Sequence, residues 1–243
     1  MRSVTPALPA CCHALRHDWL LPLPLPAVRL ASCNFTPERL QDDDPVHLGL
    51  TLPDALQTAA AKRRCEYLAG RVCAAAALQQ LGGGWQYPPR GSDRAPRWPH
   101  GYSGSLTHSH GWAVAVVAHG HHWRSLGVDA ERQIAPERAA RLARQILVEE
   151  EIAHFNRQDP GAAAEYLTLC FSLKESLFKA LYPLVGRHFT FSAAAVHLHA
   201  APGQASLELR ESLHRDWPRG RSLAGQFARR GEHRLSLIAI AAD

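Results

Sequence analysis

Two acidic residues in the segment GVDAER are spaced for binding a cation. We expect this segment to end an apolar β-strand, in which side chains two positions apart point to the same face. Asp129 and Glu131 then present two carboxylates together, and these repel each other unless something neutralises them. The pattern fits either a solvated pair at the surface or part of a divalent-cation site.

A third acidic residue lies in the segment FSLKESLFKAL, whose apolar pattern is that of a helix. Glu175 and Lys179 are four residues apart and share one face, where they could form a solvated ion pair. Glu175 also borders the apolar stripe that should pack on the sheet, and there it could join Asp129 and Glu131. Three carboxylates suit Mg²⁺, a hard cation that keeps part of its water shell. Lys174 and Lys179 beside such a metal would meet phosphate charge, as phosphoryl-group transfer requires.

Basic residues that could meet a phosphate lie earlier in the chain. Arg63 and Arg71 belong to a basic, Ala-rich helix, and Arg94 lies in a loop dense in Pro, Gly, Arg and Trp. His108 stands in GSLTHS, which we expect to be a turn whose backbone N–H groups could help to bind a phosphate. These basic residues could equally be solvated. The run HGHH at 119–122 has no carboxylate or Cys nearby, so we interpret it as a loop.

The elements that would position these residues follow from hydrophobic periodicity. In the first half, residues 1–50 have strand and loop patterns, and we expect one helix over 53–81, stopped by three glycines. A loop over 85–104 precedes an apolar strand at 112–118. We predict that this strand pairs with the strand at 125–131 as a hairpin.

The second half is predicted to contain two helices and three strands. The helices cover 136–155 and 162–184, and the strands cover 193–199, 206–209 and 234–241. The closing strand, RLSLIAIA, resembles the earlier strand WAVAVVA. The pattern therefore suggests two similar halves, each with helix and strand, and an α/β fold of the α+β kind.

The composition is that of an ordinary globular protein of 243 residues with a net charge of +5. A mild positive balance favours an anionic partner, such as nucleic acid, a phosphorylated ligand or an acidic protein. The six cysteines include no Cys-x-x-Cys pair, so we expect reduced thiols and a cytoplasmic protein. Residues 20–30 are apolar, but prolines interrupt them and they are too short to span a membrane.

The chemical segments, taken in their order, resemble a known family. GVDAE and FSLKESLFK are similar to the signature strand and helix of the 4′-phosphopantetheinyl transferases, most of all the enterobactin-synthetase type with its broad-range bacterial members. KRRCEYLAGR and RAPRWPHGYSGSLTHS resemble upstream motifs of the same group. The resemblance covers residues 60–190, and each motif is weak alone, whereas the ordered set is specific.

The resemblance implies a reaction and a fold. Members transfer the 4′-phosphopantetheine arm of coenzyme A to a serine hydroxyl of a carrier protein and release 3′,5′-ADP. Their fold has two similar α/β halves in a pseudo-twofold arrangement, with the active site between them. We therefore expect an N-terminal half at 1–122 and a C-terminal half at 123–243 that carries the metal site. We also expect carrier proteins as partners, no nucleic acid, and a monomer.

By motif position, the resemblance also gives roles to single residues. Asp129, Glu131 and Glu175 would hold Mg²⁺, and Glu175 would also be the base toward the incoming serine. Lys179 would neutralise the diphosphate and assist the leaving group. Glu151 or a neighbour stands where the family often has another functional acid. The other residues expected at coenzyme A are basic: Arg63, Arg71, Arg94, His108 and Lys174.

Other function classes stay open at this point. A basic nucleic-acid-binding domain would need clustered Lys and Arg with interleaved aromatic residues, whereas the arginines here are scattered. A metal-dependent phosphohydrolase would use the same acids with water as the nucleophile. A non-catalytic binding partner would have no need of the intact acidic set. The carrier protein could belong to fatty-acid, polyketide or nonribosomal-peptide systems, siderophore biosynthesis among them.

Overall fold

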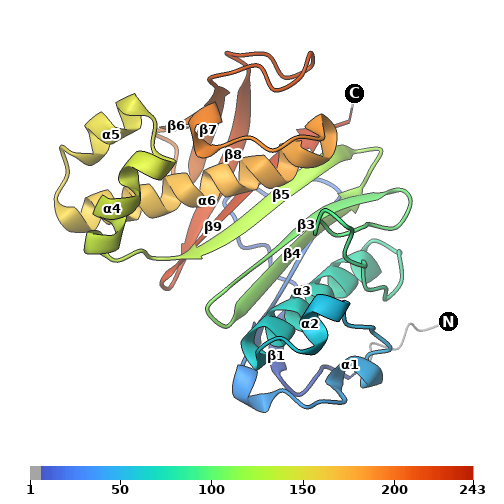
Figure 1. The fold of residues 1–243 in the computed structure, drawn as a ribbon. Helices are drawn as coiled ribbons and strands as arrows, with labels where there is room; N and C mark the ends of the chain where they lie inside the picture. Colours follow the sequence, from blue (N-terminus) through green and yellow to red (C-terminus); the bar gives the residue numbers. More distant parts are fainter. Residues whose placement is uncertain (1–6, 243) are drawn as a thin grey trace. The chain divides into compact units, whose positions relative to one another are not determined.

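The chain forms two compact units in the computed structural model, which describes residues 7–242. Of these, residues 7–19, 25–124 and 242 belong to unit 1, and residues 20–24 and 125–241 belong to unit 2. The main crossing at 124/125 lies near the predicted boundary, but the short segment in unit 2 and the last residue in unit 1 were not predicted. Each unit has one antiparallel sheet and one long helix (Figure 1), which confirms the α+β class.

Unit 1 consists of a four-stranded antiparallel sheet in the order β1-β2-β4-β3 and the helix α3, which packs on it. The helix is rich in Ala, Leu and Arg, which are strong helix formers, and its residues from Leu68 to Leu78 are buried. The predicted single helix over 53–81 is divided, because residues 58–60 leave the helical conformation. The elements of unit 1 are β1 (Cys12–Arg16), β2 (Val28–Phe35), η1 (Pro37–Arg39), α1 (Asp44–His47), α2 (Asp54–Gln57), α3 (Ala61–Gln80), β3 (Tyr102–Ser109) and β4 (Trp112–His119).

The hairpin in unit 1 joins β3 to β4. Its register runs from Ser109 opposite Trp112 to Tyr102 opposite His119. His110 and Gly111 form the two-residue turn, and both have positive φ angles, 44° and 81°, as a type I′ turn requires. The prediction of a turn at GSLTHS and of a hairpin between 112–118 and 125–131 is therefore wrong. GSLTHS belongs to a strand, and the strand that follows β4 along the chain pairs in the other sheet.

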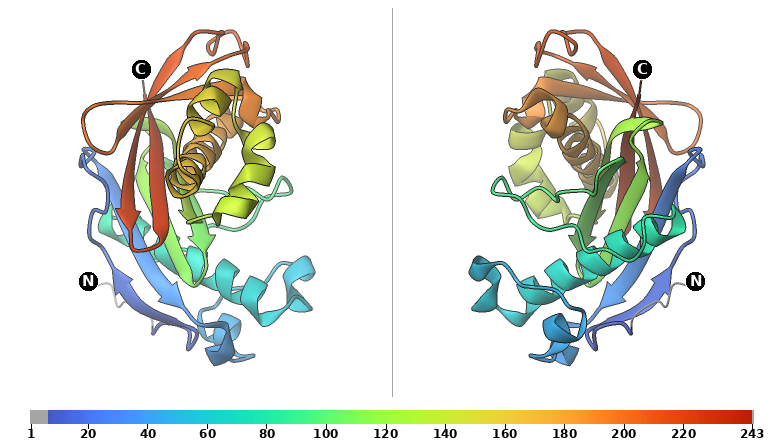
Figure 2. Two further views of the ribbon diagram at one scale, coloured as in Figure 1. Left: turned by 90° about the vertical axis from the view of Figure 1, so that its left-hand side faces the viewer. Right: turned by 90° about the vertical axis from the view of Figure 1, so that its right-hand side faces the viewer.

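Unit 2 has a five-stranded sheet in the order β5-β9-β8-β7-β6, and α6 lies along it (Figures 1 and 2). Asp159 caps the start of α6 and Gly186, in the left-handed conformation, ends it. The predicted helix over 136–155 is two helices, because Leu147 and Val148 are extended. The elements of unit 2 are β5 (Trp123–Arg132, whose first two residues belong to unit 1), α4 (Pro136–Ile146), α5 (Glu149–Phe155), α6 (Pro160–Val185), η2 (Phe191–Ala193), β6 (Ala194–Leu198), β7 (Gln204–Leu209), β8 (Ser222–Arg230) and β9 (His233–Ala241).

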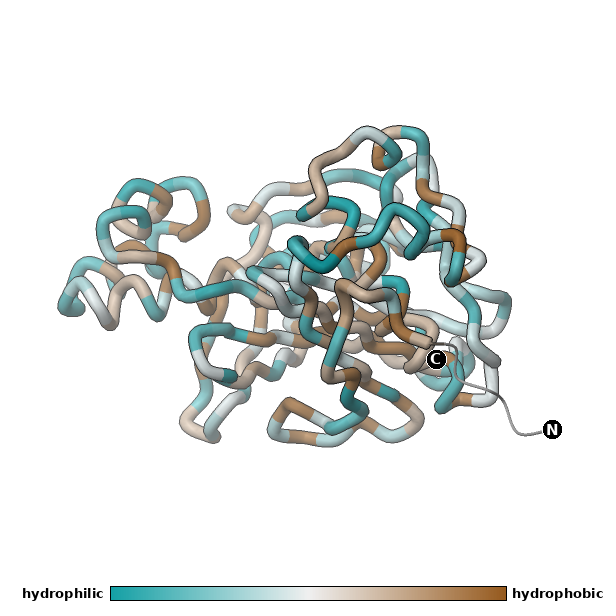
Figure 3. The backbone as a smooth tube through the Cα atoms, turned by 90° about the horizontal axis from the view of Figure 1, so that it is seen from below, coloured by the Kyte–Doolittle hydropathy of each residue, from teal (hydrophilic) through white to brown (hydrophobic). Residues whose placement is uncertain are grey.

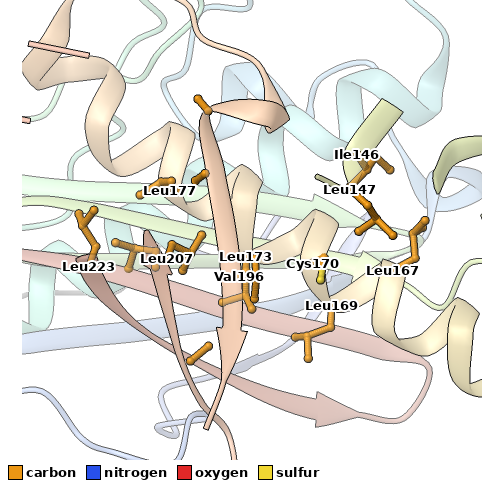
Figure 4. Close-up of a cluster of buried hydrophobic side chains, with 14 of the residues drawn as sticks. Ile146, Leu147, Leu167, Leu169, Cys170, Leu173, Leu177, Val196, Leu207 and Leu223 are labelled. Atoms are coloured by element: carbon orange, nitrogen blue, oxygen red, sulfur yellow. The ribbon is translucent and has the colours of Figure 1, made fainter. Parts of the chain in front are cut away.

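The core of unit 2 lies between α6 and the sheet (Figure 4). Leu173 and Leu177 of α6 are buried with Val196 of β6, Leu207 of β7 and Leu223 of β8. A buried leucine contributes about 1.5–3 kcal/mol relative to an exposed one, so this contact accounts for much of the packing energy. The helix is thereby fixed in rotation, which decides which of its charged residues point away from the core.

The strand β5 approaches α6 closely at Gly127. A Cβ atom at this position would collide with the backbone carbonyl of Ser176 and lie 2.6 Å from the backbone nitrogen of Ala180. The Ser125 hydroxyl donates to the carbonyl of Ala180 at 2.7 Å, and the Ser172 hydroxyl donates to the carbonyl of Asp129 at 3.3 Å. Only a residue without a side chain lets strand and helix approach so closely.

All six cysteines are buried free thiols, so the prediction of reduced thiols is confirmed. Five of them belong to unit 1, where the Cys73 Sγ lies 3.5 Å from the Cys33 Sγ. A hydrogen bond with Cys12, together with burial, raises the pKa of Cys11 to about 12. These thiols act as small apolar core residues.

No helix within residues 7–242 is long and apolar enough to cross a membrane. Figure 3 shows hydrophobic and hydrophilic residues interleaved along the chain instead of gathered in one long hydrophobic run.

We predict that Gly127→Ala lowers the free energy of unfolding by about 3 kcal/mol, because backbone atoms of α6 would have to move. Urea denaturation followed by circular dichroism measures this loss. Gly70→Ala on α3 is the matched control, because its new Cβ would meet only Leu106 at an ordinary 3.4 Å. An equal effect of the two substitutions would contradict the close approach.

Candidate functional site

The acidic residues predicted from the sequence are neighbours in unit 2. Asp129 and Glu131 lie on β5, and Glu175 lies on α6. Asp129 is 3% exposed, and its Oδ1 accepts a hydrogen bond from Lys179 Nζ at 2.7 Å. The same ammonium donates to the carbonyl of Val128 at 3.1 Å. Lys179 therefore supplies the positive charge that holds the most buried of the three acids.

Asp129 is close enough to raise the pKa values of the two glutamates. Burial and the charges of Asp129 and Glu175 together raise the pKa of Glu131 to about 7, against the opposing effect of Lys179. Burial also raises the pKa of Glu175, where Lys179 opposes the shift and Asp129 adds to it. The protein therefore holds a surplus of negative charge here, which a cation would relieve.

The residues fit Mg²⁺ in the chemistry of their donor atoms. Three carboxylates supply hard oxygen ligands, and Mg²⁺ prefers such ligands together with water. Within residues 7–242, no three His, Cys, Asp or Glu side chains are arranged to hold a metal ion as they stand. The ammonium of Lys179 contacts Asp129 Oδ1 at 2.7 Å. A metal held by Asp129 would share its carboxylate with Lys179 or take the place of this ammonium.

Lys174, which was predicted to contact the coenzyme, is paired with a buried acid and also lines a cavity of unit 2. Its side chain is 2% exposed, and its Nζ donates to Glu151 Oε2 at 2.7 Å and to the carbonyl of Ile146 at 2.8 Å. Glu151 also accepts hydrogen bonds from the backbone N–H groups of Val148 and Val196. The pair joins α4, α5, β6 and α6, so both residues have a structural role in this arrangement.

A cavity of about 160 Å³ in unit 1 collects the basic residues predicted in the first half. Arg63, Arg71, Arg94 and His108 all line it, although they come from α3, the loop before β3, and β3 itself. The other residues of its lining are Leu56, Glu66, Tyr67, Arg90, Pro96 and Leu106. The cavity therefore presents four guanidinium groups and one carboxylate.

Arg71 is the most deeply buried of these arginines, at 3% exposed. Its guanidinium lies 4.5 Å above the centre of the Tyr67 ring. Among the residues that the structure describes, no carboxylate forms an ion pair with it. Burial lowers the pKa of Arg71 because the surroundings disfavour its charge. A buried cation without an acid is the partner that a phosphate needs.

The sequence analysis missed Arg90, which reaches the cavity through a compact loop. Arg90 and Pro96 form an isolated β-bridge, and Gly91 N–H donates to the carbonyl of Ala95 at 2.8 Å. Arg94 stands inside this loop with a φ angle of 70°, which is uncommon for a residue with a side chain. The four-residue spacing of two arginines in a Gly- and Pro-rich loop was the signal available for Arg90.

Glu175 also lines a second cavity, of about 490 Å³, within unit 2. Most of its lining is apolar or aromatic, with Phe178, Phe189 and Phe191 among the residues. His188 and Tyr182 stack on Phe178 at ring-centre distances of 5.3 Å each. The cavity offers a largely apolar space beside the candidate base, with Lys174 as the other charged residue of its lining.

Comparisons with known proteins agree with the motifs. The family model "4′-phosphopantetheinyl transferase N-terminal domain" matches residues 52–118, and the model "4′-phosphopantetheinyl transferase superfamily" matches residues 125–238. Enterobactin synthase component D of Salmonella typhi is 32% identical over 211 residues, which are 83% of this chain and 86% of that protein. The 4′-phosphopantetheinyl transferase Svp of Streptomyces mobaraensis is 37% identical over 69% of this chain and 68% of its own length.

A more distant likeness is found among solved structures. A holo-(acyl-carrier-protein) synthase from Bacillus anthracis in complex with coenzyme A matches 49% of this chain and 96% of its own. Its sequence identity is 14% and its TM-score is 0.33.

We predict that Glu131 makes the metal-free protein less stable as the pH rises. The ordinary pKa is 4.5 and the folded value is about 7, so the folded state binds the proton more tightly. The benefit is complete below the ordinary value and is lost as the pH rises through about 7. In a chelating buffer, Glu131→Gln should raise the melting temperature at about pH 8 by roughly 2–4 °C and leave it unchanged at about pH 5. Glu211→Gln, at an exposed loop acid, is the control, and equal effects at both pH values would contradict the prediction.

We predict that Arg71→Met does not destabilise the ligand-free protein and raises its melting temperature by about 2 °C, because a buried cation without an acid is removed. Scanning calorimetry measures the change. Arg64→Met is the control, because it removes a half-buried arginine that is paired with Asp42. A large drop for Arg71→Met would show that its charge stabilises the fold.

Proposed function

We propose, on the premise that the chain belongs to the 4′-phosphopantetheinyl transferase superfamily, that it needs Mg²⁺ and releases 3′,5′-ADP when it modifies a carrier protein. The protein is a 4′-phosphopantetheinyl transferase, so its donor is coenzyme A and its acceptor is a carrier protein. The observation that carries the proposal is the group of three coupled carboxylates with Lys179 on β5 and α6.

Asp129, Glu131 and Glu175 are the residues that would hold the metal. When bound, Mg²⁺ would neutralise charge on the diphosphate and so make its phosphorus easier to attack. Lys179 is released from Asp129 in this proposal and contributes its ammonium charge to the leaving phosphate. Glu175 is the base: burial raises its pKa, which makes the carboxylate a better acceptor for the serine proton.

The arginine-lined cavity of unit 1 is proposed to take the 3′-phosphate end of coenzyme A. A phosphate monoester carries up to two negative charges, and Arg71, Arg90 and Arg94 offer guanidinium groups of matching geometry. The exposed phosphate of a bound nucleotide would relieve the cost of burying Arg71. This assignment uses four residues that the resemblance had marked and adds Arg90.

The apolar cavity beside Glu175 is proposed to accept the uncharged part of the donor. Phosphopantetheine carries amide and methyl groups and no charge beyond its phosphate end, which suits a lining of Phe178, Phe189 and Phe191. A substrate arm held there would lie next to the base.

The carrier protein is the partner that the relatives' names help to choose. One of them is named enterobactin synthase component D, so a carrier domain of siderophore assembly is the first acceptor to test, with fatty-acid and polyketide carriers beside it. The net charge of +5 favours encounter with an acidic carrier protein.

We predict that Asp129→Ala and Glu175→Gln each reduce transfer by at least about 10³-fold, because a metal ligand or the base is lost. Mass spectrometry of apo carrier proteins incubated with coenzyme A and Mg²⁺ measures the reaction as the gain of one phosphopantetheine on a serine. Chelation of the metal should abolish the gain in the wild-type protein.

The control for these variants is Glu211→Gln, which should transfer at the wild-type rate. Circular dichroism and the melting temperature establish that each variant is folded. Near-normal transfer by either site variant would contradict the residue assignment. Release of free phosphopantetheine without a carrier would instead favour a phosphohydrolase.

A further inference from the structure

Glu66 is an acid inside a cavity that should bind an anion. It lies on α3, and its side chain is 8% exposed. Among the described residues that line the cavity, it is the one carboxylate, against Arg63, Arg71, Arg90 and Arg94. A negative charge at this place would oppose a phosphate, so its presence needs a physical reason.

The reason lies in the contacts of one carboxylate oxygen. Glu66 Oε2 accepts a hydrogen bond from Arg63 Nη1 at 2.8 Å, and the same oxygen lies 3.9 Å from His108 Nδ1. Arg63 belongs to α3 and His108 to β3. A single buried carboxylate thus contacts two basic side chains that come from different elements.

The two partners of Glu66 need such support more than Arg71 does. The side chain of Arg63 is 64% exposed and that of His108 is 32% exposed, so neither is fixed by burial alone. Arg71 is enclosed and rests on the ring of Tyr67. Long basic side chains lose conformational entropy when a ligand fixes them, and a preformed contact removes part of that cost.

We infer that Glu66 is a positioning residue, which orients Arg63 and His108 toward the 3′-phosphate of coenzyme A without contacting the coenzyme. The inference rests on the proposed function, because it takes that phosphate as the occupant of the cavity. A carboxylate in this cavity could either repel the phosphate or position the basic side chains, and the two roles predict opposite changes in anion affinity when the carboxylate is removed. Removal of a mere repelling charge would tighten anion binding, whereas removal of a positioning group weakens it.

The experiment measures steady-state transfer with two donors, coenzyme A and dephospho-coenzyme A, which lacks the 3′-phosphate. For Glu66→Ala, we expect the KM for coenzyme A to rise about tenfold, because the loss of one charge-assisted contact weakens binding by about that factor. The kcat should stay within about twofold of the wild-type value. The KM for dephospho-coenzyme A should change by less than about twofold. Glu66→Gln keeps an acceptor oxygen and should recover part of the loss.

The matched control is Asp42→Asn. This change removes an exposed carboxylate that is paired with Arg64 of α3, and neither residue lines the cavity. It should leave both KM values unchanged. A lower KM for coenzyme A in the Glu66 variants would overturn the inference, and so would equal losses with the two donors. If Glu66→Ala does not fold, the isosteric Glu66→Gln decides by the same two comparisons.

A binding measurement without carrier or metal separates this inference from the proposed function. Calorimetry compares 3′,5′-ADP with 5′-AMP on the wild-type protein and on the Glu66 variants. If the Glu66 variants lose affinity for 3′,5′-ADP and keep their affinity for 5′-AMP, the positioning role is supported. This holds even if the wild-type protein modifies no carrier, although that failure to transfer would count against the proposed function. If the wild-type protein transfers normally and the Glu66 variants bind 3′,5′-ADP with unchanged affinity, the positioning role is overturned and the proposed function is not.

Discussion

The close approach of β5 and α6 at Gly127 is the constraint on which the acidic group depends. Because no side chain separates strand and helix there, Asp129 comes within hydrogen-bonding distance of Lys179 on α6. The Ser172 hydroxyl of α6 donates to the backbone carbonyl of Asp129, and this contact fixes the position of β5 along the helix. A larger residue at 127 would push the strand outward and separate the carboxylates of β5 from Glu175. The glycine of GVDAE is thus a packing requirement as well as part of a motif.

Each unit keeps an imbalance of charge that its own residues only partly neutralise. In unit 2 the imbalance is negative, and it shows as the raised pKa values of Glu131 and Glu175. In unit 1 it is positive, and it shows as the buried guanidinium of Arg71, which forms no ion pair with a carboxylate among residues 7–242. Both cost folding free energy, which is common where a site is built for a ligand of the opposite charge. A metal and a phosphate are the ligands of matching charge.

The sequence predicted the local features of this site and missed those that depend on distant partners. The alternation in GVDAE predicted that Asp129 and Glu131 lie together, whereas Glu175 was a plausible third acid that the resemblance of the ordered motifs assigned to them. The hairpin prediction failed because two apolar runs close in sequence looked like partners, whereas the His110–Gly111 turn directs β4 to β3. Single-sequence periodicity describes which face of a strand is apolar, but it does not say which other strand it meets.

Lys174 and Lys179 show why the missing information is tertiary. They stand five residues apart on α6, in the same motif, and each contacts an acid at 2.7 Å. Glu151, the partner of Lys174, gives its other oxygen to Val196 N–H, so the pair is enclosed and saturated. Asp129, the partner of Lys179, raises the pKa values of the neighbouring Glu131 and Glu175, and the Lys179 side chain is 27% exposed. An ion pair can open without leaving a buried charge alone only if another ion takes the place of the departing one. A cation held by Glu131 and Glu175 would do this for Asp129 when Lys179 leaves, whereas the Lys174–Glu151 pair is enclosed.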